Sequence, residues 1–110
     1  MYEIRWANND EWSEAMMMCW NTFLKFEGQT YSEEGVKNFF EFVFDPKIRA
    51  AFERGTYQLM IAYDTSVYKV VGAGSIRNRN HLSLLFVDEE YHMQGIGRGI
   101  LDGLCRYLRD

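Results

Sequence analysis

The sequence is poor in proline, cysteine and histidine. Its 110 residues contain one proline, two cysteines and two histidines, and neither internal repeats nor a low-complexity segment is visible. Cys19 and Cys105 form no Cys-x-x-Cys pair and both fall in apolar helical patterns, so we expect packed thiols in a reducing cytoplasm. His81 and His92 lack further ligands at metal-binding spacing, so we expect solvated loop histidines and no metal site.

Long apolar runs and clusters of positive charge are also missing. No apolar stretch approaches the roughly 20 residues of a membrane helix, and no secretory leader pattern opens the chain. The formal charge is −4 and the 12 basic residues are scattered, which disfavours a nucleic-acid-binding face. Hydrophobic residues make up 47% of the chain and aromatic residues 16%. We therefore expect a soluble cytoplasmic protein with one globular domain, residues 1–110, and neither nucleic-acid nor membrane partners.

Helical spacing dominates the first half of the chain. After a short alternating strand over residues 2–7, Asn9 or Asp10 can cap a helix that runs to about Glu27. A capping box of Thr30 and Glu33 predicts the start of a second helix. The Asp45-Pro46 dipeptide then predicts a short third helix over residues 46–52.

The periodicity changes to that of strands and then returns to that of a helix. Residues 56–64, 68–76 and 81–87 are rich in β-branched or aromatic residues and predict three antiparallel strands. A final helix follows, with one apolar face: Ile96, Ile100, Leu101, Leu104, Cys105 and Leu108. This order predicts an α/β (α+β) fold in which helices cover one mixed sheet.

Three alternate glycines, Gly95, Gly97 and Gly99, stand where the last strand gives way to the last helix. Bare backbone at a helix N-terminus lets a phosphate oxygen approach the unpaired N–H groups and the positive end of the helix dipole. Neither the P-loop pattern nor the dinucleotide fingerprint fits the residues present. A structural alternative is that Gly99 and Gly103 let the helix lie close to the sheet.

The segment from Gln94 to Gly99 fits the pattern [Q/R]-x-x-G-x-[G/A] and resembles the acyl-CoA signature of the GNAT superfamily of N-acetyltransferases. The resemblance implies that coenzyme A pyrophosphate binds to the backbone of Gln94, Gly95, Ile96, Gly97, Arg98 and Gly99. It also implies that Leu85, Phe86 and Val87 pair with the pantetheine arm like an added strand. The Arg98 side chain either adds charge there or is simply solvated.

The implied reaction is direct transfer of an acetyl group from acetyl-CoA to a primary amine, with no metal. Many relatives have a glutamate on the signature strand, whereas this strand offers none, so Glu27 and Asp88 are stand-ins for the base. The alternative function is a catalytically incomplete acyl-CoA-binding or interaction module that retains the cofactor half.

The resemblance also implies that the chain lacks the C-terminal part of the domain. The strand over residues 82–87 would then have one free edge, with Leu82, Leu84 and Phe86 on one face and Leu85 and Val87 on the other. We therefore expect a homodimer in which the second chain covers the Leu82–Val87 edge or the apolar surface beside it.

Overall fold

The computed structural model describes residues 1–26, 30–78 and 80–109 and confirms the α/β (α+β) class. Four strands form one sheet in the order β1-β2-β3-β4, and every neighbouring pair is antiparallel. The elements in chain order are β1 (Tyr2–Trp6), η1 (Asn9–Glu11), α1 (Trp12–Phe26), α2 (Glu33–Val43), α3 (Pro46–Arg54), β2 (Tyr57–Asp64), β3 (Lys69–Arg77), β4 (His81–Val87), η2 (Glu89–Tyr91) and α4 (Ile96–Arg109).

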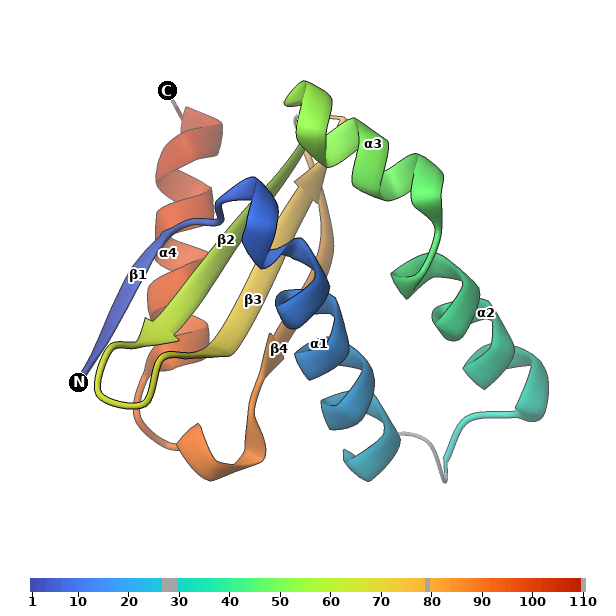
Figure 1. Cartoon of the computed structure of the whole chain (residues 1–110), viewed down its shortest axis with the longest axis horizontal. Helices are drawn as coiled ribbons and strands as arrows, with labels where there is room; N and C mark the ends of the chain where they lie inside the picture. Colours follow the sequence, from blue (N-terminus) through green and yellow to red (C-terminus); the bar gives the residue numbers. More distant parts are fainter. Residues whose placement is uncertain (27–29, 79, 110) are drawn as a thin grey trace.

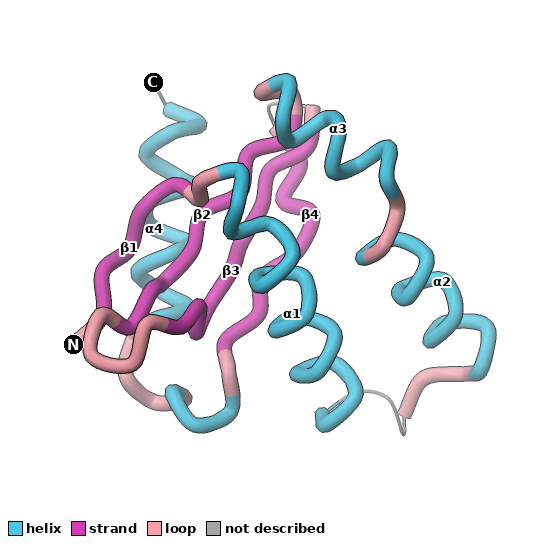
Figure 2. The backbone as a smooth tube through the Cα atoms, in the orientation of Figure 1, coloured by secondary structure: helices cyan, strands magenta, loops and turns pink. Residues whose placement is uncertain are grey.

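The helices lie on both faces of the sheet (Figure 1). On one face α1 packs over β3 and β4, and α3 packs on β2. On the other face α4 contacts all four strands. The remaining helix, α2, packs on α1 and stands away from the body of the sheet (Figure 2). The sheet therefore separates an α1 layer from an α4 layer.

The first helix begins later than its sequence pattern predicts. Asn9 and Asp10 lie inside the short helix η1, and the cap is Asn8. The N–H of Asn8 donates to Glu11 Oε1 at 2.8 Å, and the two Glu11 oxygens also accept from Arg5 at 2.8 Å each. This ion pair with β1 holds Glu11 in the capping position, so the regular helix starts only at Trp12.

The predicted Thr30–Glu33 capping box is wrong by two residues. The N-cap of α2 is Ser32, whose hydroxyl accepts from the N–H of Gly35 at 3.1 Å. A serine one position before the first helical residue offers a closer acceptor than a threonine three positions before it. The third helix begins at Pro46 as predicted, with Asp45 as its N-cap, and runs two residues further than predicted, to Arg54.

Large side chains fill the α1 layer. Trp12 stacks on Phe52 with ring centroids 4.9 Å apart, and its edge meets Tyr57 at 5.7 Å. The hydroxyl groups of Tyr57 and Ser75 share a hydrogen bond of 2.7 Å at the centre of this layer. Cys19 is fully buried here, and burial raises the pKa of its thiol to about 12, so the prediction of a packed thiol is confirmed for this cysteine.

The α4 layer packs through glycines. A Cβ on Gly74 would lie 2.6 Å from Ile100 Cγ2, and one on Gly103 would lie 2.5 Å from Met60 Sδ. Gly103 therefore belongs to the sheet-facing side of α4 and Gly74 to the strand beneath it, so Leu101, Cys105 and Leu108 point away from the sheet. The predicted apolar face is wrong at these three positions: Cys105 is exposed, and Leu101 and Leu108 are 37% and 43% exposed.

Two irregularities in strand pairing change which side chains share a face. One shift occurs where Ala62 pairs with Gly72 but Tyr63 pairs with Val70. The other occurs where Ser75 pairs with Leu84 but Ile76 pairs with Leu82. Each inserts one extra residue, so strict alternation fails. The expectation that Leu82 shares a face with Leu84 and Phe86 is wrong, because its register partner Ile76 lies in the α4 layer.

Candidate functional site

The segment that joins β4 to α4 places a helix N-terminus beside the end of an edge strand. Asp88 caps the short helix η2, accepting from the N–H of Glu90 at 3.0 Å. Met93 and Gly95 then adopt positive φ values of 68° and 79°, and α4 begins at Ile96. This conformation suits glycine at position 95, because a side chain there would be strained.

The four glycines of the segment and of α4 serve different purposes. A Cβ on Gly99 would collide with Ile4 Cδ1 of β1, and Gly103 faces Met60. These two glycines allow close packing, as the structural alternative requires. A Cβ on Gly97 would meet only Val87 Cγ2, at 3.5 Å, and one on Gly95 would meet nothing within 4 Å. Packing in the described chain does not demand a glycine at position 97.

Gly99 is the first residue of α4 whose backbone N–H has an acceptor within the helix. Its N–H donates to the carbonyl of Gly95 at 2.9 Å and is used within the helix. The N–H groups of Ile96, Gly97 and Arg98 lie in the first turn, where they have no acceptor within the helix. The geometry can therefore present three adjacent donors and the positive helix end to an anion. We call residues 95–98 the cradle.

Strand β4 is an edge of the described sheet, with β3 as its neighbour. The N–H of Asp88 donates to the carbonyl of Val71 in β3 at 2.8 Å. Because backbone direction alternates along a strand, Phe86 also faces β3, whereas Leu85 and Val87 direct their backbone groups outward. Of the three residues predicted to pair with pantetheine, two are thus oriented for it.

His92 lies exposed in the loop between η2 and α4, as the sequence predicts, but it also makes contacts that the sequence does not signal. Its Nε2 lies 2.9 Å from the carbonyl oxygen of Val87, and its ring stacks on Phe26 with centroids 5.2 Å apart. Together with Thr22, Leu85 and Phe86, these residues line a hollow of about 220 Å³ against β4. The fold brings His92 close to Phe26, and no spacing in the sequence signals this contact.

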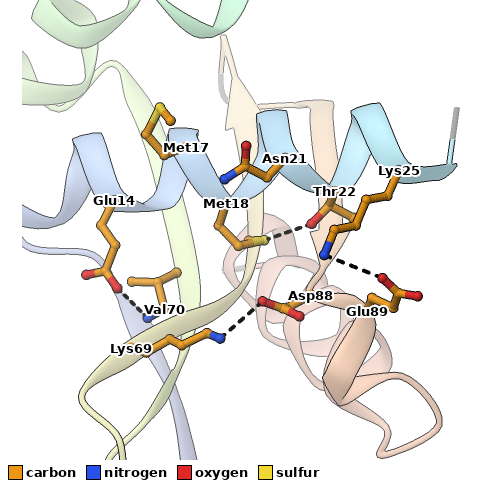
Figure 3. Close-up of a pocket in the computed structure, with 10 residues that line it drawn as sticks. All are labelled: Glu14, Met17, Met18, Asn21, Thr22, Lys25, Lys69, Val70, Asp88 and Glu89. Atoms are coloured by element: carbon orange, nitrogen blue, oxygen red, sulfur yellow. Dashed lines mark hydrogen bonds and ion pairs between the residues drawn. The ribbon is translucent and has the colours of Figure 1, made fainter. Parts of the chain in front are cut away.

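A second hollow of about 300 Å³ lies between α1, the start of β3 and the end of β4, and it shares Thr22 with the first (Figure 3). Methionine side chains and Val70 supply apolar surface, and two ion pairs border it: Lys69 with Asp88 at 3.5 Å and Lys25 with Glu89 at 3.5 Å.

Of the predicted bases, Asp88 borders this hollow, while Glu27 lies outside the described residues. Arg98 is exposed at the first turn of α4.

Two contacts that hold the segment in place were not predicted. The hydroxyl of Tyr91 donates to Asp64 Oδ2 at 2.6 Å, and the hydroxyl of Tyr2 donates to the carbonyl of Gln94 at 3.2 Å. These partners are 27 and 92 positions apart in the sequence. No local pattern connects residues at such separations, so only the folded chain reveals them.

Among residues 1–26, 30–78 and 80–109, no cluster of three or more His, Cys, Asp or Glu side chains is arranged to hold a metal ion. Within the same ranges, none of the helices combines the length and apolar character that crossing a membrane requires.

Comparison with known proteins identifies the family. A family model described as "Acetyltransferase (GNAT) domain" matches residues 27–110. No protein of curated function matches the sequence. Among solved structures, a GCN5-related N-acetyltransferase from Rhodopseudomonas palustris superposes with a TM-score of 0.78 at 21% identity, covering 96% of this chain and 64% of its own. The chain thus spans less than two thirds of that relative.

Two further structures show the same fold. The PaiA N-acetyltransferase from Thermoplasma acidophilum, solved in complex with coenzyme A, has a TM-score of 0.78 at 14% identity and covers 99% of this chain and 72% of its own. A GNAT acetyltransferase from Staphylococcus aureus Mu50 has a TM-score of 0.69 at 17% identity, with coverages of 99% and 67%. The family match and the shared fold together show that this chain belongs to the GNAT acetyltransferase family.

Proposed function

We propose that this chain binds acetyl-CoA along β4 and at the cradle, and that it transfers the acetyl group to a primary amine. The observation that carries this proposal is Gly97, a glycine beside free helical N–H groups that packing within the described chain does not require. Family membership and a relative solved with coenzyme A support the same ligand. In this proposal the pyrophosphate meets Ile96, Gly97 and Arg98. Pantetheine pairs with the outward groups of Leu85 and with the outward N–H of Val87, whose carbonyl already lies 2.9 Å from His92 Nε2.

The proposed reaction forms one bond and breaks one. The amine nitrogen attacks the thioester carbonyl, the new C–N bond forms, and the C–S bond breaks to release the coenzyme A thiolate. An outward N–H of β4 near Val87 would stabilise the developing oxyanion. Asp88 is our proposed base, because it borders the hollow in Figure 3 next to the end of β4. The base takes the proton from the ammonium, and the thiolate gains a proton as it leaves.

Calorimetric titration with acetyl-CoA tests the binding site. We expect Gly97→Val to weaken binding roughly a hundredfold, because a branched side chain blocks the approach of the pyrophosphate to the backbone. Leu101→Val is the matched control, since it places valine on an exposed part of the same helix. Equal affinity of Gly97→Val and the wild type would reject the cradle as the binding site.

A second candidate function is acyl-CoA binding without catalysis. The observation that favours it is the state of Asp88, whose carboxylate already caps η2 and pairs with Lys69. Turnover of acetyl-CoA with a panel of primary amines separates the two functions. Binding without turnover supports the binding module. Turnover that Asp88→Asn reduces at least tenfold supports the enzyme and its proposed base.

We also propose that a second copy of this chain covers the apolar surface beside the Leu82–Val87 edge in a homodimer, which leaves the outward backbone groups of Leu85 and Val87 to pantetheine. Support comes from the position of β4 at the edge of the described sheet and from Leu82 and Leu85, which are 44% and 36% exposed. Sedimentation over a wide dilution range tests this assembly. A single monomeric species at micromolar concentration, with cooperative unfolding, would contradict it.

A further inference from the structure

The hydrogen bond between Tyr91 and Asp64 joins the segment before the cradle to a distant part of the sheet. Tyr91 ends η2, and Asp64 ends β2. The donor and acceptor oxygens are 2.6 Å apart, a short contact typical of a hydroxyl bound to a carboxylate. The hydrogen bond to Asp64 raises the pKa of Tyr91 to about 12, so the hydroxyl keeps its proton over the whole physiological range.

Asp64 is itself held in place. Asp64 is 6% exposed. Its Oδ1 accepts hydrogen bonds from the hydroxyl and the backbone N–H of Ser66, at 2.6 and 2.9 Å. The bond from the Ser66 hydroxyl, followed by that from Tyr91, keeps the pKa of Asp64 well below its usual range. The carboxylate is therefore an ionised acceptor fixed by the turn between β2 and β3 (Figure 1).

Few residues separate this anchor from the cradle. The chain passes only through residues 92–94 between Tyr91 and Gly95. A second anchor acts within that interval, because the Tyr2 hydroxyl of β1 donates to the carbonyl of Gln94 at 3.2 Å. On the other side of the cradle, Gly99 rests on Ile4, also in β1. The cradle is thus fastened on both sides to strands that contribute none of its N–H groups.

We propose that Asp64 and Tyr91 are positioning residues for the phosphate cradle, with Tyr2 as a weaker second anchor. This inference rests on the proposed function, since it assigns these residues a role in binding the pyrophosphate of coenzyme A. The hydroxyl of Tyr91 touches no part of the cradle. It acts by fixing the position of residues 92–94, and through them the positions of Gly95 and the first turn of α4.

Two ligands distinguish positioning from general support of the fold. Coenzyme A carries the pyrophosphate that the cradle would bind, whereas pantetheine lacks phosphate and would still pair with β4. For Tyr91→Phe, which keeps the ring and removes the hydroxyl, we expect the dissociation constant of coenzyme A to rise roughly tenfold. The dissociation constant of pantetheine should change less than about twofold, because β4 keeps its place.

Matched variants complete the experiment. Tyr68→Phe removes a hydroxyl from a side chain of the same type that is 79% exposed, and it should leave both affinities unchanged. Tyr2→Phe should weaken coenzyme A binding roughly threefold, because a neutral carbonyl accepts a weaker bond than a carboxylate. Thermal unfolding of each variant establishes that the titrations are run on folded protein.

The results that overturn this inference differ from those that overturn the proposed function. If Tyr91→Phe binds coenzyme A as well as the wild type does, or loses affinity for both ligands equally, Tyr91 does not position the cradle. If the wild-type chain binds neither coenzyme A nor pantetheine, the proposed function fails and the positioning role fails with it. The wild-type titration therefore decides the first question before any variant is compared.

Discussion

The two layers that cover the sheet are stabilised in opposite ways. In the α1 layer, bulky side chains such as Trp12, Phe52 and Tyr57 fill the space between helix and strands. In the α4 layer, side chains are missing where helix and sheet meet, at Gly74 and Gly103 among others. The first layer is sensitive to the removal of atoms and the second to their addition.

This difference bears on function because the cradle belongs to α4. In the contact surface of α4, Ile100 and Leu104 pack tightly over a glycine of the sheet, so the helix can approach the sheet in few ways and its N-terminus is placed accurately. The α1 layer, with many rotatable side chains, can adjust to small changes without moving α4. We therefore expect damage to the two layers to affect stability and ligand binding differently.

The largest effect is expected from removing atoms in the α1 layer. Leu59→Ala deletes a side chain that is 1% exposed, and we expect a loss of about 4 kcal/mol in the free energy of unfolding. Urea denaturation measures this loss. Coenzyme A affinity of the folded fraction should stay within about twofold of the wild type, because α4 lies on the opposite face. A large loss of affinity in the folded protein would contradict the independence of the layers.

Adding atoms to the α4 layer should cost somewhat less stability but more affinity. A Cβ at Gly74 meets Ile100, Leu104 and Leu85 at 2.6, 3.1 and 3.2 Å, so Gly74→Val must push α4 outward. We expect a loss of about 3 kcal/mol in urea denaturation, together with weaker coenzyme A binding. Gly97→Ala is the control for stability, because its Cβ makes only ordinary contact. Unchanged binding in Gly74→Val would show that the cradle tolerates movement of the helix.

A smaller effect is expected from the buried polar contact of the α1 layer. Tyr57→Phe removes the hydroxyl that meets Ser75 at 2.7 Å and donates to Ser83 at 3.3 Å, leaving the fully buried Ser75 without this partner. We expect a loss of about 1.5 kcal/mol by urea denaturation. Combining this change with Ser75→Ala should recover part of the loss, and a fully additive double variant would argue against the pairing.

The smallest effect concerns Glu11, which joins β1 to the start of α1. Its hydrogen bonds from Arg5 lower its pKa from the usual value of 4.5. A depressed pKa means that the folded state favours the carboxylate, so the stabilisation is present above the unfolded pKa and is lost as pH falls below it. Glu11→Gln should cost less than about 1 kcal/mol at pH 7, because the ion pair is partly exposed.

Comparing the stability of Glu11→Gln and the wild type across pH checks this sign. The difference between the two proteins should shrink as pH falls below 4.5 and through the lowered pKa of Glu11 in the folded state, because the wild-type carboxylate then gains its proton. A difference that stays constant over this range would assign the loss to packing rather than to the charge of Glu11.

Local pattern was sufficient for much of the fold. The strand over residues 81–87 was predicted with the bounds it has, and the Asp45-Pro46 start of α3 was also predicted, because alternation and capping chemistry depend on neighbouring residues. The junction of strand and helix that carries the candidate site was predicted for the same reason, and the binding site itself stays a prediction.

The features that were not predicted depend on contacts between residues far apart in the sequence. The sheet-facing side of α4 was misplaced because Gly103 carries no apolar side chain, yet it faces Met60. The extra residue near Ser83 moves Leu82 to the other face of the sheet, and the alternation of apolar residues in the sequence does not show this change. The Gly99 N–H was counted as a phosphate donor, although the carbonyl of Gly95 already accepts it.

The attachment of α2 determines the order in which the molecule opens. Because α2 rests on α1 and reaches the sheet through aromatic contacts such as Phe39 with Phe86, at 5.5 Å, it can detach while the sheet stays intact. Its amide hydrogens should therefore exchange with solvent before those of β2 and β3. Such an opening would uncover the aromatic side of α2 together with Phe86 of the edge strand β4, so transient detachment of one helix would expose apolar surface prone to self-association.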